Sequence, residues 1–432
     1  MKAICRLMVA ALFVAPAASA TKIPIPIEGA TLNVSFQLQT QMLFNENGAP
    51  SGADPSFDVY VRRSRILING DISQNFSYLV QVDNPNFGKF GNYTGRAIVQ
   101  DAWIGWAPTG ITGPNVLYVD AGLLLIPISH HLLESTTNFV TADVHSDNFR
   151  LGSNAQYQAL RETGVQVRGW WLDKKIGFRG GVYEGLQPAQ SGGFNGTAAV
   201  CNVVPTGGTV PSACSNPKRL PQLGGFVNFD IIGSEEGGWL YGAYKWGKDP
   251  IVSVHLSGIY QSLAVKNLSG NWTDQKYAGA GLYVNWPMTE AAEFVLEVEG
   301  NRSSSGAGSG NTGYGLSADA GYRMGAIAPY IGYEYFQSDD CGDLAAPTCL
   351  TNGAVAGGPD TANTRNIRAG LNFFFNKNLN HLNLEFSANH GQSAYGNTAI
   401  TAASAGYAPI GVTTNLRKAV NKSVLLHWNV LF

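Results

Sequence analysis

The last residues of the chain alternate between apolar and polar side chains with a period of two. Leu426, Trp428, Val430 and Phe432 form one apolar row, and the residues between them are mostly polar. Successive side chains of a strand point to opposite faces, so the pattern predicts a β-strand with one apolar face. The closing strand of a membrane β-barrel has this form, because it must pair with the first strand to remove the open edge.

The same alternation recurs along the chain between Gly-, Pro- and Asn-rich connections. It predicts about sixteen strands, at residues 31–44, 58–70, 76–83, 97–107, 115–126, 162–172, 175–186, 222–232, 251–262, 276–286, 291–302, 312–324, 327–337, 365–376, 379–392 and 422–432. Short and long connections alternate, as expected for the periplasmic turns and outer loops of a bacterial barrel. Residues 239–248 fit either an extra strand or a structured periplasmic connection, and the pattern leaves both open.

An export signal precedes these strands. Residues 1–20 combine the basic Lys2 and Arg6, an apolar run at 7–14 and a small-residue cleavage motif that ends at Ala20. No later apolar run approaches the ~20 residues that a membrane helix needs. We therefore predict a cleaved secretory signal and, over residues 21–432, one all-β domain: a transmembrane antiparallel β-barrel in the outer membrane of a Gram-negative bacterium.

Charge and cysteine content narrow the function. Without Lys2 and Arg6, about 26 basic residues face 30 acidic ones, a balance that argues against nucleic-acid binding. No catalytic motif stands out, and we expect neither enzymatic activity nor a cofactor. Cys201 and Cys214, and Cys341 and Cys349, are local pairs in predicted loops; they indicate two disulfide staples, with four metal-binding thiols as the alternative.

The polar row of the strands should line the barrel interior. It includes Arg168, Arg179, Arg323 and Arg368 together with many acids. A water-filled pore accepts such charges, whereas a dry core does not. Two interpretations remain: solvated wall charges that keep the lumen wet, or a field that selects ions.

Three arginines, Arg62, Arg63 and Arg65, fall within one predicted strand. The apolar alternation changes parity there, which predicts a β-bulge at Arg62 and Arg63. We expect one or two of the arginines to face the pore and the third to face a neighbouring subunit. They either attract anions or pair with acids, and the sequence favours neither.

The connection at residues 127–160 is long and carries both apolar and charged side chains, which suits a loop that folds into the barrel and narrows it. Its candidate constriction residues are His130, His131, Glu134, Asp143, His145, Asp147 and Arg150. We expect ion selectivity to change between pH 5 and 8 if the histidines titrate in the pore. We do not predict a metal site, because adjacent histidines on an extended chain diverge.

Several stretches resemble the phosphate-selective porin O/P family. They are residues 61–72 (VRRSRILINGDI) with the following NFSY, residues 100–106 (QDAWIGW), and YVDAG at 118–122 leading to Ile126-Pro127. The resemblance is best over residues 31–190. It implies a homotrimer of sixteen-stranded barrels whose third outer loop folds inward, with an arginine and lysine ladder that carries phosphate. The terminal Trp428 and Phe432 resemble the signal that barrel-assembly machinery reads.

The first functional prediction is a porin for passive diffusion of small hydrophilic solutes and ions, embedded in outer-membrane lipid and lipopolysaccharide. The runner-up is an anion- or phosphate-selective channel, although the predicted inward loop contains no lysine. From another class, a scaffold barrel would sheathe or anchor a partner protein such as a cytochrome.

Overall fold

The computed structural model describes residues 21–23, 29–46, 48–49, 54–95, 97–108, 110, 116–145, 160–185, 220–235, 239–266, 272–304, 312–339, 364–390 and 421–432. The signal sequence, Asp147, Arg150 and the four loop cysteines lie outside these ranges, so those predictions stay predictions. Within the described residues, no helix is long and apolar enough to cross a membrane.

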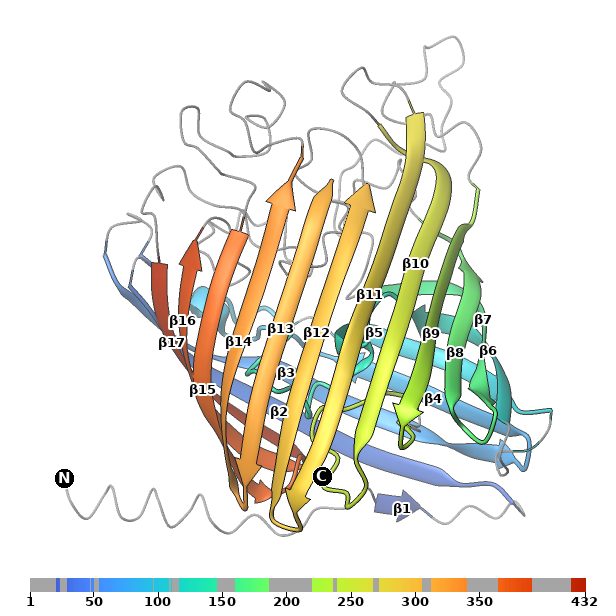
Figure 1. The fold of residues 1–432 in the computed structure, drawn as a ribbon, viewed down its shortest axis with the longest axis horizontal. Coiled ribbons are helices and arrows are strands. Elements are labelled where there is room, and N and C mark those ends of the chain that lie inside the picture. Colours follow the sequence, from blue (N-terminus) through green and yellow to red (C-terminus); the bar gives the residue numbers. More distant parts are fainter. Residues whose placement is uncertain are drawn as a thin grey trace.

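Sixteen antiparallel strands form a closed barrel, which confirms the predicted fold (Figure 1). They are β2 (Leu32–Asn45), β3 (Ser56–Ser73), β4 (Phe76–Asp83), β5 (Ile98–Trp106), β6 (Val116–Leu125), β7 (Arg161–Trp171), β8 (Ile176–Tyr183), β9 (Gln222–Ile232), β10 (Ile251–Lys266), β11 (Trp272–Thr289), β12 (Ala292–Ser304), β13 (Gly313–Met324), β14 (Ile327–Ser338), β15 (Thr364–Asn376), β16 (Asn380–His390) and β17 (Asn421–Leu431). A short strand that the pattern did not predict, β1 (Thr21–Ile23), pairs with β2 beyond the end of β17.

The last strand closes on the first, as predicted. β17 pairs with β2 in a register that sets Trp428 opposite Thr40. Beyond β17, the Phe432 N–H donates to the Phe36 carbonyl at 2.9 Å, and the two rings lie 5.2 Å apart. The barrel therefore has no open edge at this seam, and aromatic contact continues past the last ladder bond.

Each strand has an apolar outer face and a polar inner face. In β17, the inward Leu425, His427 and Asn429 are buried, whereas the outward Leu426 and Trp428 are partly exposed. Across the barrel, large apolar side chains dominate the exposed set, as a lipid-facing wall requires. The inward charges, by contrast, are buried rather than solvated, because two segments of the chain occupy the lumen.

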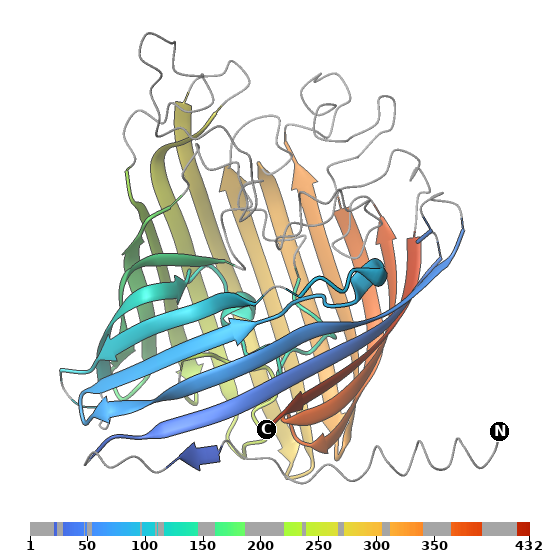
Figure 2. The same ribbon diagram turned by 180° about the vertical axis from the view of Figure 1, so that it is seen from behind.

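We call these segments the inward loop, residues 126–145 after β6, and the inward connection, residues 233–235 and 239–250 between β9 and β10. The inward loop includes the 3₁₀ turn η2 (His131–Leu133) and lies within the ring of strands in both views (Figure 1 and Figure 2). The inward connection starts from the end of the barrel that carries the tight turns. It is not a barrel strand, which resolves the open assignment of residues 239–248.

Candidate functional site in the barrel lumen

The inward loop crosses the lumen and bonds to walls far from its own strands. At one end, the Ser129 hydroxyl donates to Glu299 on β12 at 2.7 Å. Further along, the Ala142 N–H donates to Glu385 on β16 at 3.1 Å. These bonds join segments more than 160 residues apart in sequence, so they fix the loop inside the barrel rather than above it.

A carboxylate of the inward loop forms ion pairs with two of the three neighbouring arginines of β3. Asp143 accepts from Arg62 Nε at 2.6 Å and from Arg63 Nη2 at 2.9 Å, while Arg65 donates to Asp83 on β4 at 2.9 Å. Burial alone would raise the pKa of Asp143, but Arg62 and Arg63 outweigh it and hold the pKa well below its usual value. Of the two interpretations left open for these arginines, pairing with acids is therefore the one that the structure supports.

The predicted bulge explains how three neighbouring arginines reach the interior. Gln39 of β2 lies opposite Arg63, but the next residue, Thr40, lies opposite Val61. Arg62 is thus the extra residue, and the bulge lets it turn inward beside Arg63. The expectation that one arginine faces a neighbouring subunit is wrong, because Arg62, Arg63 and Arg65 all contact lumen carboxylates.

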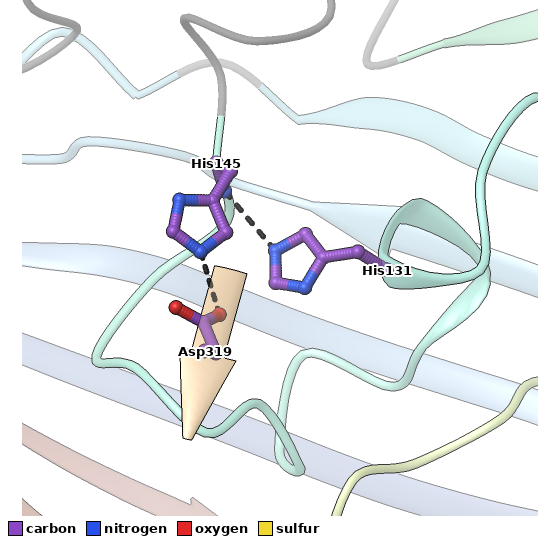
Figure 3. Close-up of side chains that lie close together, drawn as sticks. All are labelled: His131, His145 and Asp319. Carbon is purple, nitrogen blue, oxygen red and sulfur yellow. Dashed lines mark hydrogen bonds and ion pairs between the residues drawn. The ribbon is translucent and has the colours of Figure 1, made fainter. Parts of the chain in front are cut away.

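The loop histidines lie against acids of the wall and of the inward connection. His130 Nδ1 lies 2.6 Å from Glu297 of β12, and its Nε2 lies 2.6 Å from Glu235. His145 Nε2 lies 2.6 Å from Asp319 of β13 (Figure 3). All five side chains are buried. The histidines therefore serve as partners for acids rather than as solvated pore groups.

These contacts change the expected pH response. Burial lowers the pKa of His145, but Asp319 and Glu334 outweigh it and raise the pKa to about 10. For His130, Glu235 and Glu297 likewise outweigh burial and raise the pKa well above its usual value. Because a histidine with a raised pKa stays protonated below that pKa, we no longer expect these two to change selectivity between pH 5 and 8.

The inward connection pairs with the inward loop through its backbone. The Tyr241 N–H donates to the Leu133 carbonyl at 2.9 Å, and the Ala243 N–H donates to the Asn138 carbonyl at 2.9 Å. Glu134 and Tyr241 form a parallel bridge between the two segments. The two inward segments thus form one structure across the lumen, with a small piece of sheet at its centre.

Aromatic contacts attach the connection to opposite walls. At one end the ring of Trp239 lies 4.5 Å from that of Trp103 on β5. At the other end Tyr244 meets Phe374 of β15 edge-on at 5.4 Å. Gly321 of β13 makes room here, since a Cβ at this position would lie 2.3 Å from the Tyr244 hydroxyl. The connection therefore spans the lumen on ring contacts, whereas the loop adds buried ion pairs to its own apolar contacts.

The other predicted arginines face the lumen, and three of them are paired. The ion pairs are Arg168 with Asp120 at 2.7 Å, Arg323 with Glu293 at 2.5 Å and Arg368 with Glu334 at 2.8 Å. The guanidinium of Arg179 lies 5.3 Å from the ring centre of Tyr241 and 5.5 Å from that of Trp239. The arginines thus stabilise the lumen structure through carboxylates and aromatic rings.

Acids dominate the buried charge. Of the described residues, fourteen buried acids stand against six buried arginines: Asp83, Asp101, Asp120, Asp143, Asp230, Asp319, Glu134, Glu162, Glu235, Glu293, Glu297, Glu299, Glu334 and Glu385 against Arg63, Arg65, Arg168, Arg179, Arg323 and Arg368. The described lumen therefore holds more buried acids than buried arginines, and the inward-loop histidines are partners for some of these acids.

Sequence reasoning missed the inward connection and its Glu235, Trp239 and Tyr241. Two signals were available. The connection between β9 and β10 is far longer than the tight turns at the same end, and it is rich in aromatic residues. Both features also suit a strand, which is why the alternation alone left the segment ambiguous.

Comparison with solved structures places the fold among outer-membrane porins. OprB of Pseudomonas putida matches with a TM-score of 0.54 at 8% identity, over 93% of this chain and 94% of that chain. The outer membrane channel DcaP of Acinetobacter baumannii matches with a TM-score of 0.52 at 11% identity, over 96% and 100%. OmpF of Salmonella typhi, solved in complex with daunomycin, matches with a TM-score of 0.52 at 12% identity, over 95% and 100%.

At these identities the likeness concerns the fold. No family model matches the chain, and no curated protein matches it. The chain therefore has the fold of outer-membrane porins, and the solute must be inferred from its own lumen.

Proposed function

We propose that the protein is an outer-membrane porin for passive diffusion of small hydrophilic solutes and ions. One observation carries the proposal: a closed sixteen-stranded barrel whose inner face is polar and charged, with a long loop folded into the lumen. A barrel that only anchored something in the membrane would have no need for a polar interior. The two inward segments favour a narrow channel for solutes of small size.

The lumen charges favour cations over anions. An anion or phosphate ladder needs arginines or lysines that a passing anion can contact. Here Asp143 occupies Arg62 and Arg63, Asp83 occupies Arg65, and acids dominate the buried charge. We therefore keep phosphate selectivity as the runner-up only. A scaffold that sheathes a partner is less well supported, since the chain's own segments occupy the lumen.

We place the mature barrel in lipid and lipopolysaccharide, inserted by the barrel-assembly machinery, and we propose a homotrimer. The experiment that tests the channel is single-channel recording of purified protein in planar bilayers. We expect stepwise conductance in KCl. In a KCl gradient, we expect a reversal potential whose sign shows a preference for cations. Absence of conductance at any voltage would overturn the channel, and a reversal potential on the anion side would favour the runner-up.

A further inference from the structure

Glu134 is a buried carboxylate whose position calls for a cation. It is 2% exposed, and within the part of the chain that the structure describes, neither Oε1 nor Oε2 has a hydrogen-bond partner. Buried polar atoms are nearly always bonded, and a buried carboxylate that is not stabilised by a partner is costly. Two unsatisfied oxygens on one side chain therefore need a physical explanation.

The groups that face Glu134 are metal-binding groups. His130 Nδ1 lies 4.0 Å from Glu134 Oε1 and 2.6 Å from Glu297 Oε1. One donor atom from each of these three side chains falls within 4.8 Å of the others. Two ligands of a tetrahedral zinc ion, each roughly 2.0–2.1 Å from the metal, stand about 3.3 Å apart, so the observed distances bracket the required spacing.

A second layer of contacts orients two of these donors. The far nitrogen of His130, Nε2, lies 2.6 Å from Glu235, and His131 Nδ1 lies 3.3 Å from Glu297 Oε2. His131 Nε2 accepts the backbone N–H of His145 at 3.1 Å, so Nδ1 carries the proton of the neutral ring and donates to Glu297 (Figure 3). A carboxylate behind a ligating histidine, and a donor behind a ligating carboxylate, are the usual outer shell of a metal site.

We propose that His130 Nδ1 and the carboxylates of Glu134 and Glu297 bind one divalent transition-metal ion, with Zn²⁺ as the best fit, between the inward loop and the β12 wall. The charges balance, because two carboxylates neutralise a divalent ion and imidazole binds as the neutral ring. Binding displaces the proton that His130 otherwise shares with Glu297. One imidazole and two carboxylates suit zinc better than magnesium or calcium, which prefer all-oxygen sites. The proposal is independent of what the channel conducts.

Local backbone geometry makes this site possible where the sequence argued against it. Divergence of adjacent histidines assumes an extended chain, but His130 is helical (φ −60°, ψ −51°) and opens the turn η2. The turn brings Glu134 beside His130, four residues earlier in the chain. The argument against a metal site assumed an extended chain at His130, and the structure has a turn there instead.

A neighbouring group, His131, His145 and Asp319, has the same kind of side chains but is less suited (Figure 3). The lone pair of His131 Nε2 already accepts a backbone N–H, and His145 Nε2 already lies 2.6 Å from Asp319. Each group contains one short histidine–carboxylate contact, but only the first also contains a carboxylate, Glu134, with both oxygens unbonded, whereas the second has a histidine nitrogen already used as an acceptor. This contrast supplies a matched control.

The test is zinc binding to the purified full-length barrel, made metal-free by chelator dialysis. Zn²⁺ is titrated against a metallochromic indicator, and bound metal is counted by plasma mass spectrometry. Wild type should bind one Zn²⁺ per chain, and bound Co²⁺ should show the intense visible bands of tetrahedral coordination. Glu134→Gln, which keeps the shape of the side chain, should weaken binding by more than about 100-fold, since loss of an outer-shell partner alone costs roughly 10–100-fold. Glu235→Gln removes only an outer-shell partner, so it should weaken zinc binding by roughly 10–100-fold.

Asp319→Asn is the matched control and should retain the wild-type affinity. Heat-modifiable migration in gel electrophoresis shows that each variant is a folded barrel before binding is measured. Loss of zinc in Asp319→Asn with retention in Glu134→Gln would move the site to the neighbouring group and overturn the proposal. Failure of the folded wild type to bind Zn²⁺ would also overturn it, while single-channel conductance, measured separately, would still decide the channel function.

Discussion

The two inward segments meet in the lumen and share apolar clusters there, but the contacts that anchor them to the walls differ. The inward loop is pinned by buried charge, as in the pairs that Asp143 makes with Arg62 and Arg63. The inward connection is pinned by rings, as in the contacts of Trp239 with Trp103 and of Tyr244 with Phe374. Charge pairs demand one geometry, because an unpaired buried charge is costly, whereas ring contacts tolerate small shifts. The loop should therefore determine the shape of the conducting path. The connection should determine how much of the lumen cross-section is blocked.

The largest expected effect follows from removing the connection. Replacing residues 234–249 with a two-residue turn, like the one between β11 and β12, should raise single-channel conductance several-fold, because the segment spans the lumen between β5 and β15. Selectivity should change less than conductance, since the Arg62 and Arg63 pairs with Asp143 remain. Planar-bilayer recording measures both. Unchanged conductance would mean that the conducting path avoids the connection.

Breaking the charge anchor should be the next largest effect. Asp143→Asn leaves the buried Arg63 and the partly buried Arg62 beside a neutral group, and loss of one partner of a buried pair costs roughly 3–5 kcal/mol. The free energy of unfolding in urea should fall by about this amount. The inward loop, released from the wall, should be cleaved faster by added protease.

The matched control for that change is Glu290→Gln at the exposed pair between Lys248 and Glu290. Both side chains are largely exposed, at 78% and 81%, so water screens the interaction and unfolding should not change measurably. Equal effects of the two substitutions would show that burial does not strengthen the Asp143 anchor, and the contrast between the two segments would fail.

Trp239→Ala tests the aromatic anchor. Trp239 is partly buried, so its loss should cost less than the roughly 3–5 kcal/mol of a fully buried tryptophan. We expect a fall of about 2 kcal/mol in the free energy of unfolding and a small rise in conductance. Trp239→Phe, which keeps a ring against Trp103, should recover most of the loss. A deficit as large in the phenylalanine variant would mean that the Trp239 ring does not anchor the connection.

Comparison of the two segments also shows what the sequence can reveal. The strands β4 and β9 match their predicted bounds, and the Arg62 bulge was visible as a parity change, because period-two alternation records which face is buried. The inward loop was visible because a connection rich in both apolar and charged residues has no reason to stay in solvent. Alternation fails where a segment packs on several walls, as the inward connection does. Period-two alternation also does not reveal a short turn such as η2, and this turn determines the direction of the His130 side chain.

The smallest expected difference is the one between two glycine variants, at positions that make room for the two segments. A Cβ at Gly321 would lie 2.3 Å from the Tyr244 hydroxyl of the connection, and one at Gly332 would lie 2.6 Å from Asp319 and 2.8 Å from Thr141 of the loop. Overpacking of this kind costs roughly 1–3 kcal/mol. If the rings of the connection can shift and the ion pairs of the loop cannot, Gly321→Ala should lower the free energy of unfolding by an amount near the lower end of that range. Gly332→Ala should lower it by an amount near the upper end. Urea unfolding measures both. The reverse order would show that the connection is the more rigid of the two, and would assign the shape of the channel to its rings.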